Sequence, residues 1–152
     1  FQEALEILKT MGSSVTLVGD IGSGNTAKLA NQMIVALNIA AVSEALLFAQ
    51  KAGCNPEKVY EAIRGGLAGS TVMDAKAPMM LSRNFKPGFR IELHIKDLMN
   101  AVDAAERIGY DLPFTGQVLQ MMQMLNSDNK GKLDHSALIQ YYEKLCGFEL
   151  KK

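Results

Sequence analysis

The sequence predicts an all-α fold, in which a helical domain is built around one long helix near the N-terminal end and follows a short α/β stub. Three observations support this fold class: residues 25–52 form an apolar helical run, only residues 14–18 resemble a strand, and helical spacing recurs between capping residues elsewhere. We place the boundary between the stub (residues 1–20) and the helical domain (residues 21–152) at the glycine-rich turn that joins them.

The first twenty residues combine a predicted helix with a predicted strand. Apolar side chains recur at helical spacing in residues 1–11, Gly12 stops that helix, and "SSVTLVG" has the character of a short strand. A lone strand cannot complete a β-ladder, so residues 14–18 must pair with a neighbouring chain or with a sheet outside these residues. We favour the second alternative, and we therefore expect residues 1–20 to be the end of a helix–strand domain that is missing.

Residues 25–52 are predicted to form one long helix that ends at Gly53 in the C-cap role. Its apolar side chains occupy all sides, and such a helix has to be enclosed by other helices of its own chain or of a partner. We therefore expect the protein to be a homo-oligomer that associates through this helix. Glu44 interrupts the apolar run and argues against a membrane span.

Five further helices are predicted from capping residues and apolar spacing. Ser70 is expected to cap the helix that contains "TVMDAKA", and Pro78 is expected to end or kink it. Asp134 is expected to cap the last helix. The remaining starts and stops, in chain order, are Asn55, Pro56, Ile95, Gly109 and Pro113.

Composition argues against several classes of protein. Lysine plus arginine equals aspartate plus glutamate at 16 each, so no net charge would recruit nucleic acid or an acidic membrane surface. Cys54 and Cys146 form either a bridge or two reduced thiols, and we favour reduced thiols in a cytoplasmic protein. His94 and His135 have no partners at metal-ligand spacing, so we predict no metal site and assign them no chemistry.

The stretch "GDIGSGNTAKLAN", residues 19–31, is the candidate functional motif. It is not a Walker loop, because Gly24 is not followed by lysine, and its G-x-x-G-x-G order differs from the Rossmann fingerprint. Phosphate binding by this loop alone is therefore disfavoured. Instead, the glycines allow close approach where a helix begins, and Lys28 then shares a helical face with Asn31 and Gln32.

Lys28 has two possible roles at this position. If its amine faces away from bulk water, burial and the positive end of the helix both disfavour the ammonium form, and the side chain can exchange a proton near neutrality. Alternatively, Lys28 is an ordinary solvated lysine on the surface, and spacing alone favours this second role.

The stretch "GDIGSGNTAKLANQMIVALNIAAVSEALLFAQKAG" resembles the opening of the C-terminal domain of the β-hydroxyacid dehydrogenases. The likeness continues through "GGLAGS", "KPGFRIELHIKDLMNAVDAA" and "LP", so it covers nearly the whole chain, and the order and separation of these motifs carry it. Within that family, "VALNIAAVSEAL" is most similar to the bacterial tartronate semialdehyde reductases. The resemblance implies a Rossmann-type dinucleotide-binding domain, with residues 1–20 as its remnant, before an all-helical substrate and dimerisation domain.

The resemblance also implies an activity, which is the NAD- or NADP-dependent reduction of a small oxo acid. By this resemblance, Lys28 is the catalytic acid/base, and one of the two amides at Asn31 and Gln32 binds the substrate, which leaves those two as alternatives. Most of the cofactor is expected to be bound by the missing domain, so the isolated chain is expected to be inactive. The segment "FRIELHIKD" is expected to contribute the cofactor-binding residues Phe89, Lys96 and Asp97.

Each of these three residues also has a purely structural explanation. Phe89 can fill the core, Lys96 can belong to a solvated polar stripe, and Asp97 in the first turn of a helix can gain from the macrodipole. Two other functions stay open. One is a 3-hydroxyisobutyrate dehydrogenase or a related enzyme of small hydroxyacids, and the other is a helical dimerisation module without catalysis of its own.

Overall fold

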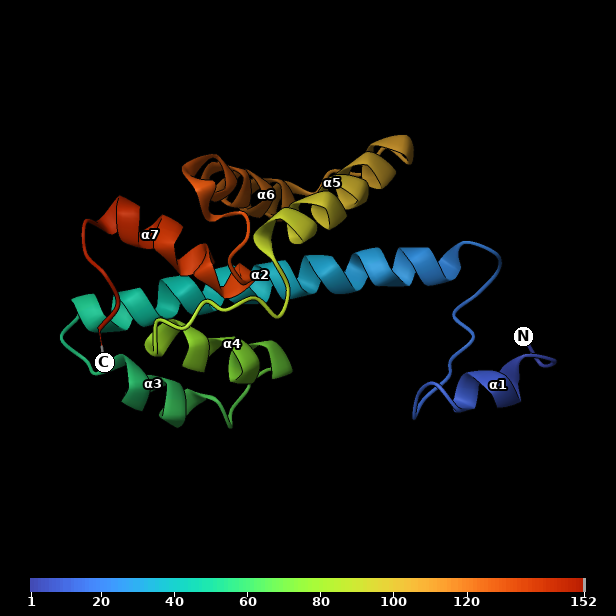
Figure 1. Cartoon of the computed structure of the whole chain (residues 1–152), viewed down its shortest axis with the longest axis horizontal. Coiled ribbons are helices and arrows are strands. Elements are labelled where there is room, and N and C mark those ends of the chain that lie inside the picture. The colour runs from blue at the N-terminus through green and yellow to red at the C-terminus, as the bar shows by residue number, and fades with distance from the viewer. Residues whose placement is uncertain (152) are drawn as a thin grey trace.

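One long helix, α2 (Ser23–Lys51), forms the axis of the computed structural model, which describes residues 1–151. Within those residues the chain forms helices and loops but no β-strand, which confirms the predicted all-α fold (Figure 1). The other elements, in chain order, are α1 (Leu5–Lys9), α3 (Pro56–Ile63), α4 (Thr71–Leu81), α5 (Ile91–Arg107), α6 (Pro113–Leu125), the π-helical η1 (Asn126–Lys130), the 3₁₀-helical η2 (His135–Leu138) and α7 (Ile139–Cys146). α3 and α4 lie along one side of α2, and α5, α6 and α7 lie along the other.

The core forms where these helices contact α2. α2 packs against every α-helix from α3 to α7, and its residues Ile39 and Leu46 are almost completely buried. Full burial of one such side chain contributes about 1.5–3 kcal/mol, so the middle of α2 is a main source of stability. The helix is long and apolar enough to cross a bilayer by length and composition, but here it is the central helix of a packed bundle.

One face of α2 stays uncovered by the other helices of this chain, so its enclosure by a partner stays a prediction. Ile34 is 61% exposed and Phe48 is 75% exposed, although both belong to the apolar helix. The chain therefore covers α2 on the sides that face α3–α7 and leaves a part of its apolar surface open.

The first turn of α2 depends on a glycine. Gly22 precedes the helix with φ at 98°, a left-handed conformation that side chains with a Cβ rarely adopt. The helix begins at Ser23, two residues earlier than the sequence indicates, and it ends at Lys51, just before Gly53 with its φ of 85°. Lys28 consequently lies in the second turn of α2.

Capping residues set the starts of α3 and α4 as predicted. The Asn55 side chain accepts a hydrogen bond from the Lys58 amide at 3.0 Å, and that of Ser70 accepts one from the Met73 amide at 3.0 Å. Of the two alternatives for Pro78, to end the helix or to kink it, the first is wrong, because α4 continues to Leu81. The proline removes one hydrogen bond in the last turns, and burial of the residues that follow it offsets that loss.

α5 begins four residues earlier than predicted. The amides of Ile91 and Glu92 donate to the carbonyls of Leu133 and Gly131, each at 3.0 Å. A distant loop therefore supplies hydrogen-bond acceptors for amides that have no partner within the first turn of the helix. Asp97 therefore lies in the second turn of α5, and the structural explanation that placed it in a helix first turn is wrong.

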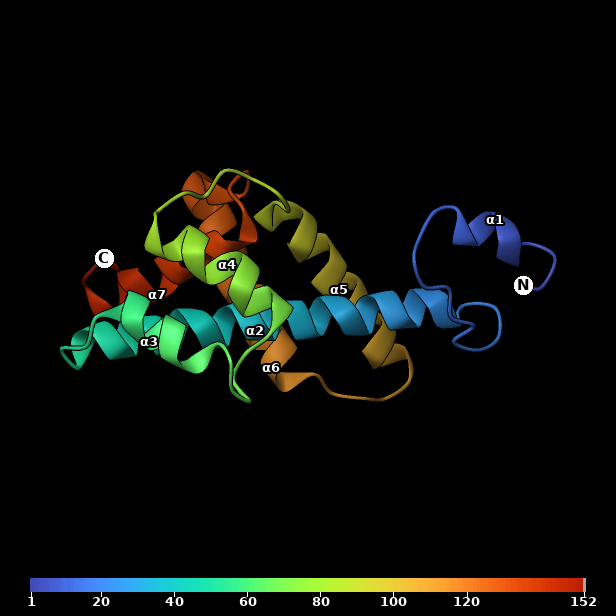
Figure 2. The same cartoon turned by 90° about the horizontal axis from the view of Figure 1, so that it is seen from below.

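The strand predicted at residues 14–18 does not form. These residues make no ladder within the part of the chain that the structure describes, and Leu17 is 62% exposed. The helix predicted before it is reduced to α1, and α1 lies apart from the bundle in both views (Figure 2). The physical reason is that a strand needs a neighbour, and these residues have none here.

Candidate active site

The centre of the candidate site is an ion pair between α2 and α5. The amine of Lys28 contacts the carboxylate of Asp97, whose side chain is only 5% exposed. The Lys28 side chain is 48% exposed, so it is neither fully solvated nor turned away from bulk water. The pair instead combines a buried carboxylate with an amine that a molecule in solution can reach.

The two amide side chains lie at different depths in the site. Gln32 is buried, and its Nε2 donates to Asp97 Oδ2 at 2.8 Å. Asn31 is exposed, and its Nδ2 donates to Gln32 Oε1 at 3.2 Å. Gln32 is thus held by the carboxylate, whereas Asn31 lies at the surface beside Lys28.

Asp97 is ionised because several donors surround it. Burial alone would raise the pKa of Asp97, but hydrogen bonds from Lys28, Gln32 and Lys96 lower it below its ordinary value. The Lys96 amine lies 3.3 Å from Asp97 Oδ1 and its side chain is 66% exposed. The site therefore presents two cations to solvent around one buried anion.

Behind the ion pair lie two buried histidines that sequence reasoning left without a role. His94 Nδ1 and His135 Nδ1 are 3.0 Å apart, and His94 Nε2 is 3.1 Å from the main-chain oxygen of Gln32. The ring of Phe89 packs edge-on against His94 with centroids 5.6 Å apart, and it also contacts His135. Sequence spacing could not reveal this pair, because the two histidines are 41 residues apart.

Burial keeps both histidines neutral. It lowers the pKa of His94 and, together with the positive charge of Lys76, lowers the pKa of His135 to about 3. Asp97 opposes the shift at His94 and Asp134 opposes it at His135, but burial dominates in each case.

These shifts predict a stability that falls with acidification. In the unfolded chain His135 takes up a proton below about pH 6.5, but in the folded chain it does so only near pH 3, so the unfolded state binds more protons in that window. We expect the free energy of unfolding to fall by about 1.4 kcal/mol per pH unit from His135 as the pH drops below about 6, and His94 adds to the fall. Urea unfolding at pH 7, 6 and 5 measures this.

The matched control for that experiment is His135→Leu, which should have a shallower dependence on pH over the same range. The paired carboxylates lose their contribution only at lower pH, because their folded-state pKa values are depressed. Equal unfolding free energies at pH 7 and pH 5 would contradict the expectation.

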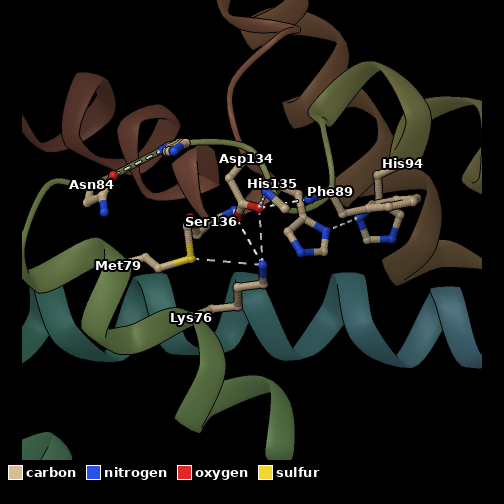
Figure 3. Close-up of polar contacts among 10 residues, drawn as sticks. Lys76, Met79, Asn84, Phe89, His94, Asp134, His135 and Ser136 are labelled. Carbon is tan, nitrogen blue, oxygen red and sulfur yellow. Dashed lines mark hydrogen bonds and ion pairs between the residues drawn. The ribbon is translucent and has the colours of Figure 1, made fainter.

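The loop that carries Phe89 is held by a second buried anion, Asp134 (Figure 3). Asp134 is fully buried and accepts hydrogen bonds from the amides of Gly88, Phe89 and Ser136, each at 3.0 Å. The amine of Lys76 lies 3.0 Å from its Oδ1. Burial would raise the pKa of Asp134, but these donors lower it well below its usual range. Asp134 caps η2, which leads directly into the last helix α7, and it also fixes the backbone of the Phe89 loop.

The structure thus brings the six predicted residues into one region. Lys28, Asn31, Gln32, Lys96 and Asp97 form a connected polar cluster, and Phe89 joins it through the ring of His94. A cavity of about 800 Å³ near Arg83 and Glu143 shares no residue with this cluster. Residues 1–151 contain no group of three or more side chains suited to a metal ion, and Cys54 and Cys146 are free and exposed.

Comparisons with known proteins identify the family. Residues 22–142 match the family model described as "NAD-binding of NADP-dependent 3-hydroxyisobutyrate dehydrogenase". The chain is 43% identical over 150 residues to the 2-hydroxy-3-oxopropionate reductase of Escherichia coli (strain K12). This match covers 99% of this chain and 51% of that protein. It is 35% identical over 141 residues to an Arabidopsis thaliana protein named "Probable 3-hydroxyisobutyrate dehydrogenase-like 1, mitochondrial". This match covers 93% of this chain and 42% of that protein.

The fold agrees with these relationships. It is similar to the crystal structure of 3-hydroxyisobutyrate dehydrogenase from Salmonella typhimurium, with a TM-score of 0.85 and 26% identity over 92% of this chain and 50% of that one. Fold and family match together define a helical domain of the kind that the 3-hydroxyisobutyrate dehydrogenase family model describes. The chain belongs to the 3-hydroxyisobutyrate dehydrogenase family, and it spans about half the length of the relatives it matches.

Proposed function

We propose that this chain is the helical substrate domain of an enzyme that reduces 2-hydroxy-3-oxopropionate (tartronate semialdehyde) to D-glycerate with NAD(P)H. The observation that carries the proposal is the Lys28–Asp97 pair, in which a buried carboxylate holds a solvent-accessible amine. The Escherichia coli relative named 2-hydroxy-3-oxopropionate reductase supports this choice of substrate.

In the proposed reaction, Lys28 is the general acid. As the aldehyde carbon gains a hydride, its oxygen gains negative charge, and the Lys28 ammonium stabilises that charge and then gives the oxygen a proton. In the reverse direction the neutral amine takes the proton from the hydroxyl group. Asp97 and Gln32 orient the amine, and Asn31, the more exposed of the two amides, is placed to hydrogen-bond the substrate.

The residues around Lys28 suit a nicotinamide dinucleotide, which supplies the hydride when it is bound. Lys96 offers an exposed ammonium beside the site, which fits an anionic cofactor. Phe89 is only partly buried and presents an aromatic surface next to the histidines. We propose that Phe89, Lys96 and Asp97 form the edge of the cofactor site and that a dinucleotide-binding domain, of which residues 1–20 are the end, forms the rest.

We test the choice of substrate by comparing two aldehydes. Turnover of the full-length protein on tartronate semialdehyde should exceed turnover on methylmalonate semialdehyde by at least about tenfold in kcat/KM, because a site that hydrogen-bonds a substrate hydroxyl discriminates against an analogue that lacks it. The opposite preference would favour a 3-hydroxyisobutyrate dehydrogenase, and the Salmonella typhimurium and Arabidopsis thaliana relatives are the specific observation in favour of that alternative.

Experiments on the isolated chain of 152 residues measure its association separately from the activity of the full-length protein. We expect the isolated chain to show no activity and negligible binding of NADH or NADPH, and to sediment as a homo-oligomer, because the exposed Ile34 and Phe48 leave apolar surface on α2. In that state the isolated chain would be a helical dimerisation module. For the intact protein we propose a cytoplasmic location. Cofactor binding at micromolar concentration, or a strict monomer in sedimentation, would contradict these expectations.

A further inference from the structure

His94 and Asp97 lie one turn apart on α5, and both contact the same residue of α2. His94 Nε2 lies 3.1 Å from the main-chain oxygen of Gln32, and Asp97 Oδ2 accepts a hydrogen bond from Gln32 Nε2 at 2.8 Å. α5 is therefore attached to both the main chain and the side chain of Gln32. These contacts fix the two helices relative to one another at the level of the ion pair.

This double attachment sets the position of Asp97 against Lys28. Lys28 and Gln32 are one turn apart on α2 and share Asp97 as their partner. A shift of α5 along α2 by a single residue, about 1.5 Å, would break the bond from His94 and draw the carboxylate away from the amine. The Gln32 carbonyl has two lone pairs, so it can accept from His94 and still take part in its own helix.

The chemistry of the acceptor fixes the tautomers of both histidines. A carbonyl oxygen only accepts, so His94 Nε2 carries the hydrogen, and the Nδ1 of this neutral ring is an acceptor. His135 must then donate from its Nδ1 to His94 Nδ1 across 3.0 Å. The main-chain amide of His135 donates to the Phe89 carbonyl at 2.9 Å, which connects the pair to the Phe89 loop.

This arrangement leaves one buried nitrogen without a partner. Among the buried side-chain nitrogen and oxygen atoms of residues 1–151, His135 Nε2 is the one without a hydrogen-bond partner. An unpaired buried polar atom destabilises a fold, and an apolar pair of similar size would avoid that cost. Stability alone therefore does not explain the two histidines, whereas a requirement for a directed donor to Gln32 does.

We propose that His94 is a positioning residue for the Lys28–Asp97 site, with His135 as the group that selects the required tautomer of His94. The pair transfers no proton to the substrate and acts through Gln32. The inference rests on the proposed function, because its effect on turnover requires Lys28 to be the acid.

The test uses two matched pairs of variants in the full-length protein. His94→Leu removes the donor to Gln32, and His94→Gln keeps an N–H near the same place. We expect His94→Leu to lower kcat at least tenfold with KM for the cofactor changed less than twofold, and His94→Gln to recover most of the loss. His135→Leu and His135→Asn form the second pair: the first removes the donor to His94 Nδ1, and the second keeps an N–H near the same place. If His94→Leu does not fold, the same comparison of kcat within this second pair tests the proposal.

A spectroscopic readout on the chain itself is independent of activity. Long-range ¹H–¹⁵N spectra should show hydrogen on Nε2 of His94 and on Nδ1 of His135. The side-chain amide signals of Gln32 should shift in His94→Leu and stay near their original positions in His94→Gln. The opposite tautomers, or equal kcat in the unsubstituted protein and a folded His94→Leu, would overturn the proposal.

Failure of this inference can be distinguished from failure of the proposed function. If only the positioning role is wrong, Lys28→Ala is inactive while His94→Leu is fully active. If the proposed function is wrong, Lys28→Ala keeps its turnover as well.

Discussion

Replacing Lys28 with alanine should lower kcat of the full-length protein about 10²–10⁴-fold and leave the affinity for the cofactor nearly unchanged. The range is that of a single general acid, because the variant loses proton transfer to the substrate oxygen and keeps the rest of the site. Steady-state kinetics with varied aldehyde and varied cofactor separate the two quantities. The loss should appear in kcat and kcat/KM together, as for an interaction made only in the transition state.

One further variant and a matched control define what the amine of Lys28 does. Lys28→Arg keeps a positive charge opposite Asp97, but a guanidinium does not release its proton near neutral pH. It should therefore be nearly as inactive as Lys28→Ala, whereas activity close to that of the unsubstituted protein would show that charge alone suffices. Lys51→Ala is the matched control, because Lys51 lies at the other end of α2, where its amine contacts the ring of Phe148.

Replacing Asp134 with alanine should destabilise the chain by about 3–5 kcal/mol. Lys76, whose side chain is only 15% exposed, would keep a buried charge without a counterion. The amides of Gly88, Phe89 and Ser136 would also lose their shared acceptor. Urea unfolding of the isolated chain measures the change, which is a large part of the stability of a typical domain.

The control for this measurement is an ion pair of similar geometry at the surface. Asp128 lies 2.9 Å from the amine of Lys144, and both side chains are well exposed. Asp128→Ala should leave the unfolding midpoint unchanged within error, because solvent screens such pairs. A change of less than about 1 kcal/mol in Asp134→Ala would mean that the Lys76 amine reaches water and that the buried pair is not a source of stability.

Local patterns in the sequence were sufficient for most of the helices. Asn55 and Ser70 cap their helices as predicted, because capping depends on neighbours within three residues. The position of Lys28, Asn31 and Gln32 on one side of α2 also followed from helical spacing. The start of α5 was missed because it depends on contacts from a distant segment, the loop at residues 131–133.

The candidate site was predictable only in part. The resemblance to the dehydrogenase family indicated Lys28 and Asp97, but their direct contact joins two helices and is absent from any local pattern. The roles of His94 and Asp134 depend on partners 41 and 58 residues away, so spacing rules for metal sites and caps gave either no role or an incomplete one. The strand at residues 14–18 failed for the opposite reason, since its pattern is local but its hydrogen bonds need a neighbour.

The central claim, that the Lys28 amine supplies the proton which accompanies hydride transfer, is tested most directly by chemical rescue of Lys28→Ala. The rate of aldehyde reduction is measured as small primary amines of different basicity are added to the full-length variant. The account predicts a very low rate without amine and a rate that rises with amine concentration and varies with amine basicity. Turnover close to that of the unsubstituted protein without added amine, or no response to any amine, would contradict it.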